Sequence, residues 1–365
     1  MTLRRRELMA SAVAAVTGAP TLPVLADSGP SLREPPREPL SLTLSTAQND
    51  RFAERVREAT RDVSRALVGK LLLPADAASQ VDPSSSRRAV IHAMVTVNGE
   101  IRGFFSTWSP GVLKSASQGS TSKVLGAVAL ATARPDLLAA DATWAAQPVR
   151  GLREADGTRG GGRLSAGEAV ARSRNLPAAW VFSRMPDDDL RAALRSGGIE
   201  APAGYPAAIS LAFGHIQWSA MDVLCLFDAI ASGSARGVNL SRSQVRPKPL
   251  VAWVARSLER SHSGAEALST LLAGPVLHPR GTARHLKAAL TGLSPIAKTG
   301  TVVNRHGENV AKVLALAFQP RPKVVAAAYV AMVSPRLNQP LGTNLPSAAF
   351  GPLHRTLIEY AKEIS

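Results

Sequence analysis

The sequence predicts an α/β (α+β) fold, in which an antiparallel sheet is flanked by helices and an all-helical subdomain lies beside it. Three observations support this prediction. Strand patterns occur near both ends of the chain, as a hairpin over residues 89–105 and as strands over 295–333. The stretch between them, from about 124 to 290, is mostly helical and rich in small residues. Amphipathic helical patterns precede the first strand and follow the last one, so helices are expected to cover the sheet.

A helix is predicted before the first strand. Its apolar residues recur every three or four positions among charged ones, which is typical of a helix with one buried stripe. The members of this stripe are Phe52, Val56, Ala59, Val63 and Leu67. An apolar run over 89–97, the turn dipeptide Asn98-Gly99 and a second run over 100–105 then indicate a β-hairpin.

Two stretches of the helical part have features of ligand sites, but local structure explains both. Asp187-Asp188-Asp189 follows Pro186. Acidic residues are favoured in the first turn of a helix by its dipole, so a helix start is expected there rather than a metal site. The glycine-rich loop over 157–163 lacks the strand–helix context and the lysine of a phosphate-binding loop.

The last third of the chain returns to strand patterns. A strand is expected over 295–303. The runs 310–318 and 324–333 are almost entirely apolar, which is typical of strands buried on both faces. A closing helix is expected over 352–364. It would pack through three apolar residues at helical spacing, namely Leu353, Leu357 and Tyr360.

Composition limits the functional classes. The chain has 365 residues, of which 45% are hydrophobic and 4% aromatic, enough for one large core or two modest ones built mainly from aliphatic and alanine side chains. Its formal net charge of +16 favours anionic partners such as nucleic acid, a membrane surface or an acidic polymer. Nucleic acid is not expected, because the sequence has no zinc-ligand spacing, RNA-binding motif or DNA-reading helix. The single Cys225 excludes an intramolecular disulfide and is expected to be buried, and no metal or cofactor is expected.

The N-terminal residues 1–26 predict an export signal. Arg5-Arg6 and the residues after them resemble a twin-arginine signal, and Val24-Leu25-Ala26 resembles a small-residue cleavage site. The apolar segment between them is too short and too interrupted for a membrane-spanning helix. We therefore expect export to the periplasm in folded form and no stable membrane span after cleavage, with a disordered basic tail as the alternative. Residues 27–45 are proline-rich and are expected to form an extended linker.

One short motif has the residue types needed for nucleophilic catalysis. Gly119-Ser120 opens an apolar run that starts at Val124, so a helix N-terminus is expected there. Ser120 and Lys123 are three residues apart, which places them within contact on one face of a helix. Desolvation lowers the pKa of a lysine, and the neutral amine can then remove the serine proton, while the backbone N–H of Ser120 would face a developing oxyanion. By itself, however, this pattern is also common on solvated helix turns.

Two further motifs support a catalytic interpretation of this serine. Ser173-Arg174-Asn175 and Lys298-Thr299-Gly300-Thr301 follow it, and Ser-x-x-Lys, Ser-x-Asn and Lys-Thr-Gly each occur once, in that order. With these motifs the chain resembles the penicillin-binding transpeptidases and serine β-lactamases, the D,D-peptidase superfamily. The resemblance extends from about residue 89 to the C-terminus. It implies a β-lactamase/transpeptidase-like fold, a penicillin-binding transpeptidase domain over 46–365 with its helical subdomain over about 124–290, and a catalytic cleft between subdomain and sheet.

The resemblance implies catalytic roles for four motif residues. Ser120 is the expected acylated nucleophile, and Lys123 is the base that takes its proton. Ser173 would relay a proton to the leaving amine. Lys298 would supply positive charge beside Ser173 and the substrate carboxylate.

Four neighbouring residues are expected to bind the substrate. By the same resemblance, Asn175 would hydrogen-bond the substrate amide, and the hydroxyls of Thr299 and Thr301 would bind its carboxylate. Gly300 would let the substrate backbone approach closely. The backbone N–H of Thr301 would complete the oxyanion hole with that of Ser120.

The sequence also departs from the family pattern. Gln118 stands where proline is common before the serine. After Thr301 the family often has a second threonine and an Asp-Trp-Phe segment, and here Val302 and Val310-Ala-Lys-Val-Leu314 stand instead. Between Asp189 and Asp222 the only acidic residue is Glu200, which does not match the carboxylate-bearing loop that class A β-lactamases use for deacylation. We therefore expect penicillin to acylate the serine and to be released slowly.

These observations predict a periplasmic serine D,D-transpeptidase that cross-links peptidoglycan stem peptides and is inhibited covalently by β-lactam antibiotics. A D,D-carboxypeptidase or a serine β-lactamase would use the same chemistry and remains an alternative. An alternative of another class is a wall-binding or sensory module of this fold with degraded catalysis, which the altered sequence after Thr301 would allow. Residues 27–88 are too few for a glycosyltransferase domain, so a separate glycosyltransferase is an expected partner.

Overall fold

The computed structural model describes residues 46–66, 89–107, 115–149, 152, 154, 160–233, 249–304, 308–334, 341 and 347–365. The expected signal over 1–26, the linker over 27–45 and Leu67 lie outside these residues, as does the start of the glycine-rich loop at 157–159. Within the described part of the chain, no helix has the length and apolar character needed to cross a membrane.

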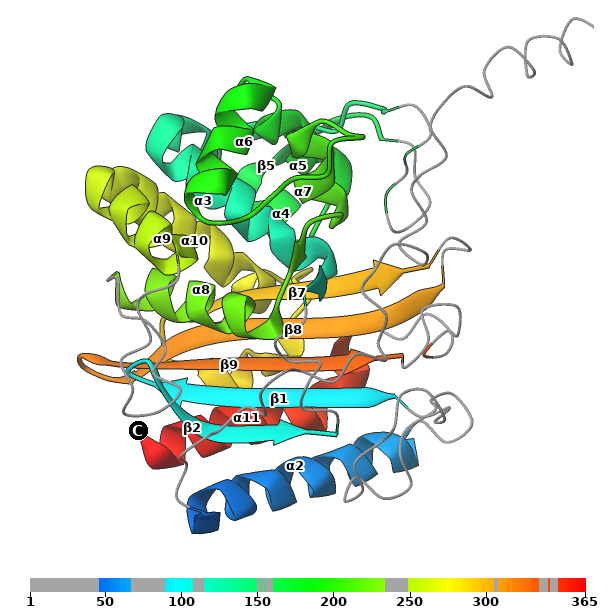
Figure 1. The fold of residues 1–365 in the computed structure, drawn as a ribbon, viewed down its shortest axis with the longest axis vertical. Helices are drawn as coiled ribbons and strands as arrows, with labels where there is room; N and C mark the ends of the chain where they lie inside the picture. The colour runs from blue at the N-terminus through cyan, green and yellow to red at the C-terminus, as the bar shows by residue number, and fades with distance from the viewer. Residues whose placement is uncertain are drawn as a thin grey trace, which may run out of the picture.

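A five-stranded antiparallel sheet forms the centre of the molecule, in the order β2-β1-β9-β8-β7 (Figure 1). β1 (Val90–Val97) and β2 (Glu100–Ser106) form the predicted hairpin, whose turn residues Asn98 and Gly99 both have positive φ. The other three strands are β7 (Ile296–Val303), β8 (Asn309–Arg321) and β9 (Val324–Val333). Because β9 pairs with β1, the two ends of the chain build one sheet, and β7 forms its edge.

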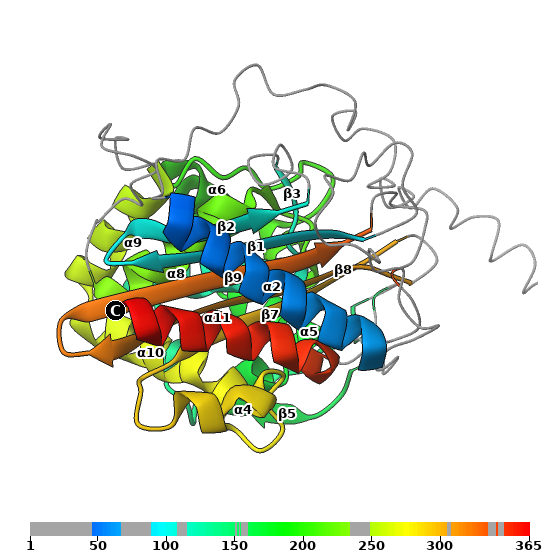
Figure 2. The ribbon, with the colours of Figure 1, turned by 90° about the horizontal axis from the view of Figure 1, so that it is seen from below.

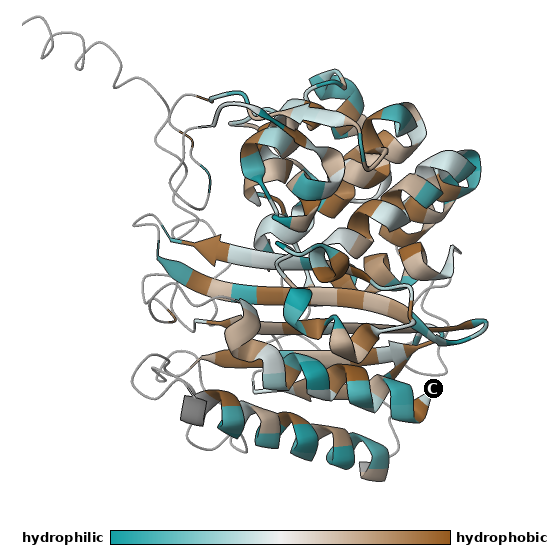
Figure 3. Ribbon diagram, turned by 180° about the vertical axis from the view of Figure 1, so that it is seen from behind, coloured by the Kyte–Doolittle hydropathy of each residue, from teal (hydrophilic) through white to brown (hydrophobic). Residues whose placement is uncertain are grey.

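Two helices, α2 (Thr46–Ala66) and α11 (Gly351–Ile364), cover one face of the sheet (Figure 2). The predicted stripe of α2 is buried against α11, since Phe52 and Val56 have no exposed surface and Phe52 packs on Tyr360 with ring centroids 4.7 Å apart. In Figure 3 both helices alternate between hydrophilic and hydrophobic residues, as expected of amphipathic helices on a sheet. The predicted contact residues of α11 are also buried, namely Leu353, Leu357 and Tyr360.

The other face carries the helices that follow the hairpin in the chain (Figure 1). They are α3 (Lys123–Ala133), α4 (Ala166–Ala171), α5 (Asn175–Phe182), α6 (Asp187–Ser196), α7 (Ala207–Phe213), α8 (Ala220–Ser232), α9 (Pro249–Arg260) and α10 (His262–Leu277). Short strands pair between them, β3 (Ala116–Ser117) with β6 (Gln217–Trp218) and β4 (Thr143–Ala145) with β5 (Arg163–Ser165). The 3₁₀ turns are η2 (Gly119–Ser122), η3 (Pro135–Leu138), η4 (Arg284–Leu286), η5 (Ala288–Leu290) and η6 (Ser347–Phe350).

β8 and β9 are buried on both faces, as their apolar runs predicted. Successive side chains of a strand point to opposite faces. On β8, Leu314, Leu316 and Phe318 therefore join the core under α2 and α11, while Ala315 and Ala317 join the core under the other helices. α8 contacts β8 and β9 on this second face, where the alanine side chains leave room for it.

Two local predictions in the helical part are confirmed. α6 begins at Asp187, so the three aspartates form its first turn. The Asp187 carboxylate also accepts a hydrogen bond from the backbone N–H of Ala207 (2.6 Å) and one from Arg191 (2.6 Å), which explains its position without a metal. Cys225 is buried in α8. Among the described residues, no three His, Cys, Asp or Glu side chains are grouped as a metal site.

Candidate active site

The Ser-x-x-Lys motif lies where η2 leads into α3, directly against the edge strand β7. Gly119 begins η2 with a φ of 58°, and a Cβ at this position would lie 2.4 Å from the carbonyl oxygen of Thr301. A Cβ on Gly300 would lie 2.2 Å from the carbonyl oxygen of Gln118. Neither space admits a side chain, so these two glycines allow the turn that carries Ser120 to lie against the Lys-Thr-Gly strand.

Gln118, the residue before this turn, anchors it to two other elements. Its buried side chain accepts a hydrogen bond from the Tyr329 hydroxyl of β9 (2.7 Å) and donates one to the carbonyl oxygen of Trp218 in β6 (3.2 Å). The proline that is common here in the penicillin-binding transpeptidases could form neither bond. In this chain, side-chain hydrogen bonds hold the turn where a proline would restrict the backbone itself.

Lys123 is the first residue of α3, and its amine lies at the centre of a polar cluster. Its Nζ donates hydrogen bonds to Ser120 Oγ (2.6 Å), to Asn175 Oδ1 (2.7 Å) and to the carbonyl oxygen of Ser173 (3.3 Å). The fold thus brings the first two motifs into contact through one amine.

Lys298 reaches the second motif from β7. Its Nζ donates to Ser173 Oγ (2.6 Å) and to the carbonyl oxygen of Thr299 (2.8 Å). Ser173 has a φ of 57°, a conformation that is uncommon for a residue other than glycine. In this conformation Ser173 offers its carbonyl to one lysine and its hydroxyl to the other. The hydrogen-bonded cluster consists of Ser120, Lys123, Ser173, Asn175 and Lys298.

Burial dominates the electrostatics of both lysines. Lys123 is 6% exposed and Lys298 is 1% exposed, and apolar side chains such as Val124 and Phe182 line the space around them. Desolvation disfavours a charged amine and lowers the pKa of Lys123 to about 7, although the charge of Glu154 opposes this shift. The pKa of Lys298 is lowered well below its usual value by burial and, second, by the positive charge of Lys123. A neutral amine is therefore accessible near neutral pH.

The two threonines of the third motif are held from the other face of β7. Thr299 Oγ1 donates a hydrogen bond to Thr282 Oγ1 (2.8 Å), which lies between α10 and η4. Lys312 Nζ, from β8, donates to Thr301 Oγ1 (3.1 Å), and these two residues are paired across the strands. In this contact Lys312 uses an acceptor site of Thr301 Oγ1 and not its O–H. Burial lowers the pKa of Lys312 to about 8.

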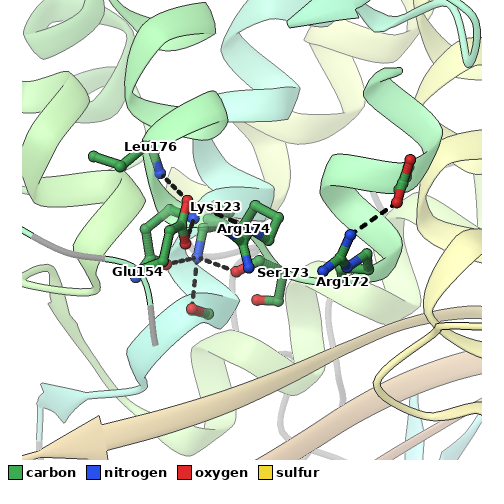
Figure 4. Close-up of polar contacts among 9 residues, drawn as sticks. Lys123, Glu154, Arg172, Ser173, Arg174 and Leu176 are labelled. Carbon is green, nitrogen blue, oxygen red and sulfur yellow. Dashed lines mark hydrogen bonds and ion pairs between the residues drawn. The ribbon is translucent and has the colours of Figure 1, made fainter. Parts of the chain in front are cut away.

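Glu154, from the loop between β4 and β5, lies beside the Lys123 amine (Figure 4). Its carboxylate accepts hydrogen bonds from the backbone N–H groups of Asn175 (2.7 Å) and Leu176 (2.8 Å), the first two residues of α5. The Nε of Arg174 lies 3.6 Å from one of its oxygens, and the Glu154 side chain is only 1% exposed. This carboxylate therefore contacts the second motif and acts electrostatically on the first.

Sequence reasoning missed three residues of this site, namely Glu154, Thr282 and Lys312. Lys312 had a usable signal, because the β7–β8 hairpin register pairs it with Thr301. Thr282 and Glu154 carry no local signal. They reach the motifs only because distant parts of the chain fold onto them.

Comparison with known proteins supports the fold at the level of structure. A scan against protein-family models and a search of curated proteins find no match. The apo structure of the TP domain of penicillin-binding protein 3 from Burkholderia pseudomallei matches with a TM-score of 0.57 and 17% identity, covering 91% of this chain and 98% of that one. PBPA from Mycobacterium tuberculosis matches with a TM-score of 0.57 and 17% identity, covering 84% of this chain and 78% of that one.

A third neighbour is the D,D-transpeptidase domain of a peptidoglycan glycosyltransferase from Eggerthella lenta. It has a TM-score of 0.55 and 15% identity, and it covers 88% of this chain and 82% of that one. The chain therefore has the fold of penicillin-binding protein transpeptidase domains, which confirms the fold predicted from the three motifs.

Proposed function

We propose that the protein is a serine D,D-transpeptidase that cross-links peptidoglycan stem peptides through an acyl-enzyme on Ser120. One observation carries the proposal. The hydroxyls of Ser120 and Ser173 each lie 2.6 Å from a buried lysine amine, within a fold shared with penicillin-binding transpeptidase domains. A carboxypeptidase or a β-lactamase would share the first half of this reaction and differ in what attacks the acyl-enzyme.

Acylation begins with attack of Ser120 Oγ on the carbonyl carbon of the scissile amide. Neutral Lys123 takes the hydroxyl proton as the new O–C bond forms, and the amine becomes an ammonium. A pKa of about 7 suits this task, because a large neutral fraction exists near neutral pH in an amine that is still basic enough to accept the proton. We assign the developing oxyanion to the backbone N–H groups of Ser120 and Thr301.

The second half of acylation breaks the C–N bond, and the leaving nitrogen needs a proton. The Ser173 hydroxyl gives its proton to this nitrogen. It recovers one from the lysine pair, which gained a proton from Ser120 in the preceding step. Lys298, whose amine contacts the Ser173 hydroxyl, is the member of the pair that can return this proton directly, and the proton gained by Lys123 restores the balance of the pair. In transpeptidation, an acceptor amine then attacks the ester on Ser120.

Two carboxylates of the described residues support slow release of penicillin. A hydrolysing enzyme of class A needs a carboxylate that activates water. Both oxygens of Glu154 already accept backbone hydrogen bonds, and its side chain is almost fully buried. Glu200, the acidic residue noted in the sequence, is exposed beyond α6. Neither arrangement favours water activation, which supports a lasting acyl-enzyme over β-lactamase activity.

Labelling with fluorescent penicillin tests the chemistry. The purified full chain should become labelled, and Ser120→Ala should abolish the label. A wild-type protein that stays dark would point instead to a binding module without catalysis.

The products test the type of reaction. Muropeptides incubated with the protein and separated by HPLC should show cross-linked dimers. Trimmed tetrapeptides would identify a carboxypeptidase, and rapid nitrocefin turnover would identify a β-lactamase. We place the enzyme in the periplasm, with glycan strands supplied by a separate glycosyltransferase, and cell fractionation that finds it only in the cytoplasm would contradict this location.

A further inference from the structure

Glu154 belongs to none of the three motifs, and the proposed reaction does not use it. Its carboxylate is nevertheless buried and fully engaged at the start of α5. The residue that precedes the helix, Arg174, makes no side-chain hydrogen bond to cap it. The first N–H groups of a helix need acceptors, and a negative charge is favoured there by the helix dipole. Glu154 supplies both from a segment 21 residues earlier in the chain.

This contact fixes the part of the site that surrounds the general base. Glu154 holds the backbone of Asn175, whose side-chain oxygen in turn accepts a hydrogen bond from Lys123 (2.7 Å). Ser173, in its uncommon backbone conformation, lies two residues before Asn175. Loss of the Glu154 carboxylate would therefore loosen two of the three hydrogen-bond partners of the Lys123 amine, Ser173 and Asn175, at once.

Glu154 also carries the negative charge that balances the site. Among the described residues, the charged groups near the Lys123 amine come from three elements. Glu154 comes from the β4–β5 loop and Arg174 from the turn before α5 (Figure 4), and Lys298 comes from β7. Arg174 and Lys298 are basic. Burial lowers the pKa of Lys123, and Glu154 is the group whose charge raises it.

We propose that Glu154 is a positioning residue for the acylation of Ser120. It holds the first turn of α5 around Lys123, and its charge stabilises the protonated form of that lysine. The chemical part of this inference rests on the proposed function. Without the carboxylate, Lys123 would lose its proton at a lower pH. Its hydrogen-bond acceptors Ser173 and Asn175 would also be held less firmly.

The test compares the full chain with Glu154→Gln over pH 5 to 9, with the second-order rate constant of fluorescent-penicillin labelling as the readout. The wild-type rate should rise with pH through about 7, as Lys123 becomes neutral. In Glu154→Gln the plateau should fall by about tenfold, and the rising limb should move to lower pH by about one unit. Glu200→Gln makes the same chemical change at an exposed position and should leave the plateau and the limb unchanged.

A limb that does not move in folded Glu154→Gln would overturn the proposal, because the residue would then be a structural cap alone. Glu154→Asp keeps the charge but shortens the side chain, so its plateau should fall while its limb stays at the wild-type pH. If Glu154→Gln does not fold, as judged by circular dichroism, the aspartate variant decides. A limb displaced in Glu154→Asp would overturn the proposal.

A second readout needs no reaction. Carbon-13 NMR of ε-labelled lysines, assigned with Lys123→Arg, follows the titration of Lys123 directly. It should show a lower pKa in Glu154→Gln than in the wild type. If wild-type protein is not labelled by penicillin, the proposed function fails, and this titration still decides whether Glu154 controls Lys123. Equal titration curves would overturn the inference alone.

Discussion

The two faces of the sheet both carry apolar cores, but they differ in the polar groups buried beside those cores. Under α2 and α11 the contacts are mainly apolar, with Phe52, Leu357 and Tyr360 all buried. On the other face, beside α3 and α5, the protein buries the amines of Lys123 and Lys298 among hydroxyl, amide and carbonyl groups. Burial of apolar surface stabilises a fold, whereas burial of an amine without a full ionic partner destabilises it. The apolar cores of both faces therefore stabilise the fold, whereas the two buried amines of the second face reduce its stability.

The largest effect that would sharpen this contrast is expected from Lys123→Met. Loss of the base should slow penicillin acylation by about 10²–10⁴-fold. The pKa of Lys123 is lowered from 10.5 to about 7 on folding, so the folded chain binds the proton less tightly than the unfolded chain at neutral pH, and the lysine costs stability there. The free energy of unfolding should therefore rise by about 1–4 kcal/mol, measured by urea denaturation at pH 7.

The control for this variant is Lys287→Met, at an exposed position between η4 and η5. It should change neither the acylation rate nor the free energy of unfolding by a measurable amount. A Lys123→Met protein that is less stable than the wild type would break the contrast between the faces.

Leu357→Ala on α11 is expected to lower the stability of the protein without changing its acylation rate. The leucine is 1% exposed between the helix and the sheet, so the substitution should leave a cavity and lower the free energy of unfolding by about 2–5 kcal/mol. The rate of acylation by the remaining folded protein should stay at the wild-type value at 20 °C. Leu277→Ala makes the same change at a side chain that is 44% exposed and should have little effect on either quantity. An acylation rate that falls with stability would show that the two faces are coupled.

The smallest effect is expected from Lys312→Met, which tests whether a residue of the apolar face also serves the site. Lys312 donates to Thr301 Oγ1, so its loss should weaken non-covalent binding of an anionic ligand by about tenfold and leave the first-order acylation step unchanged. Because burial lowers the pKa of Lys312 to about 8, wild-type binding should weaken as pH rises through 8, and the variant should lack this dependence. Saturation kinetics of penicillin labelling separate the two constants. A change confined to the first-order step would contradict this role.

Two helix starts show where sequence reasoning reaches its limit. α8 has a local cap, because Ser219 and Asp222 hydrogen-bond each other's backbone and side chain within one turn. Such a cap can be recognised from residues three positions apart. α5 has no local cap, since Arg174 offers none and Glu154 comes from a distant loop. No pattern around Asn175 predicts that contact.

By itself, the sequence determined the alternation of strands and helices, the buried stripes of α2 and α11, and three motifs in a recognisable order. These features follow from periodicity and from residue identity, which are local properties of the chain. Only the tertiary structure decided that Glu154 reaches α5, that Thr282 and Lys312 hold Thr299 and Thr301, and that two lysines are buried side by side. Hydrogen-bond partners and pKa values depend on desolvation and on charges brought from distant segments, so they exist only once the chain has folded.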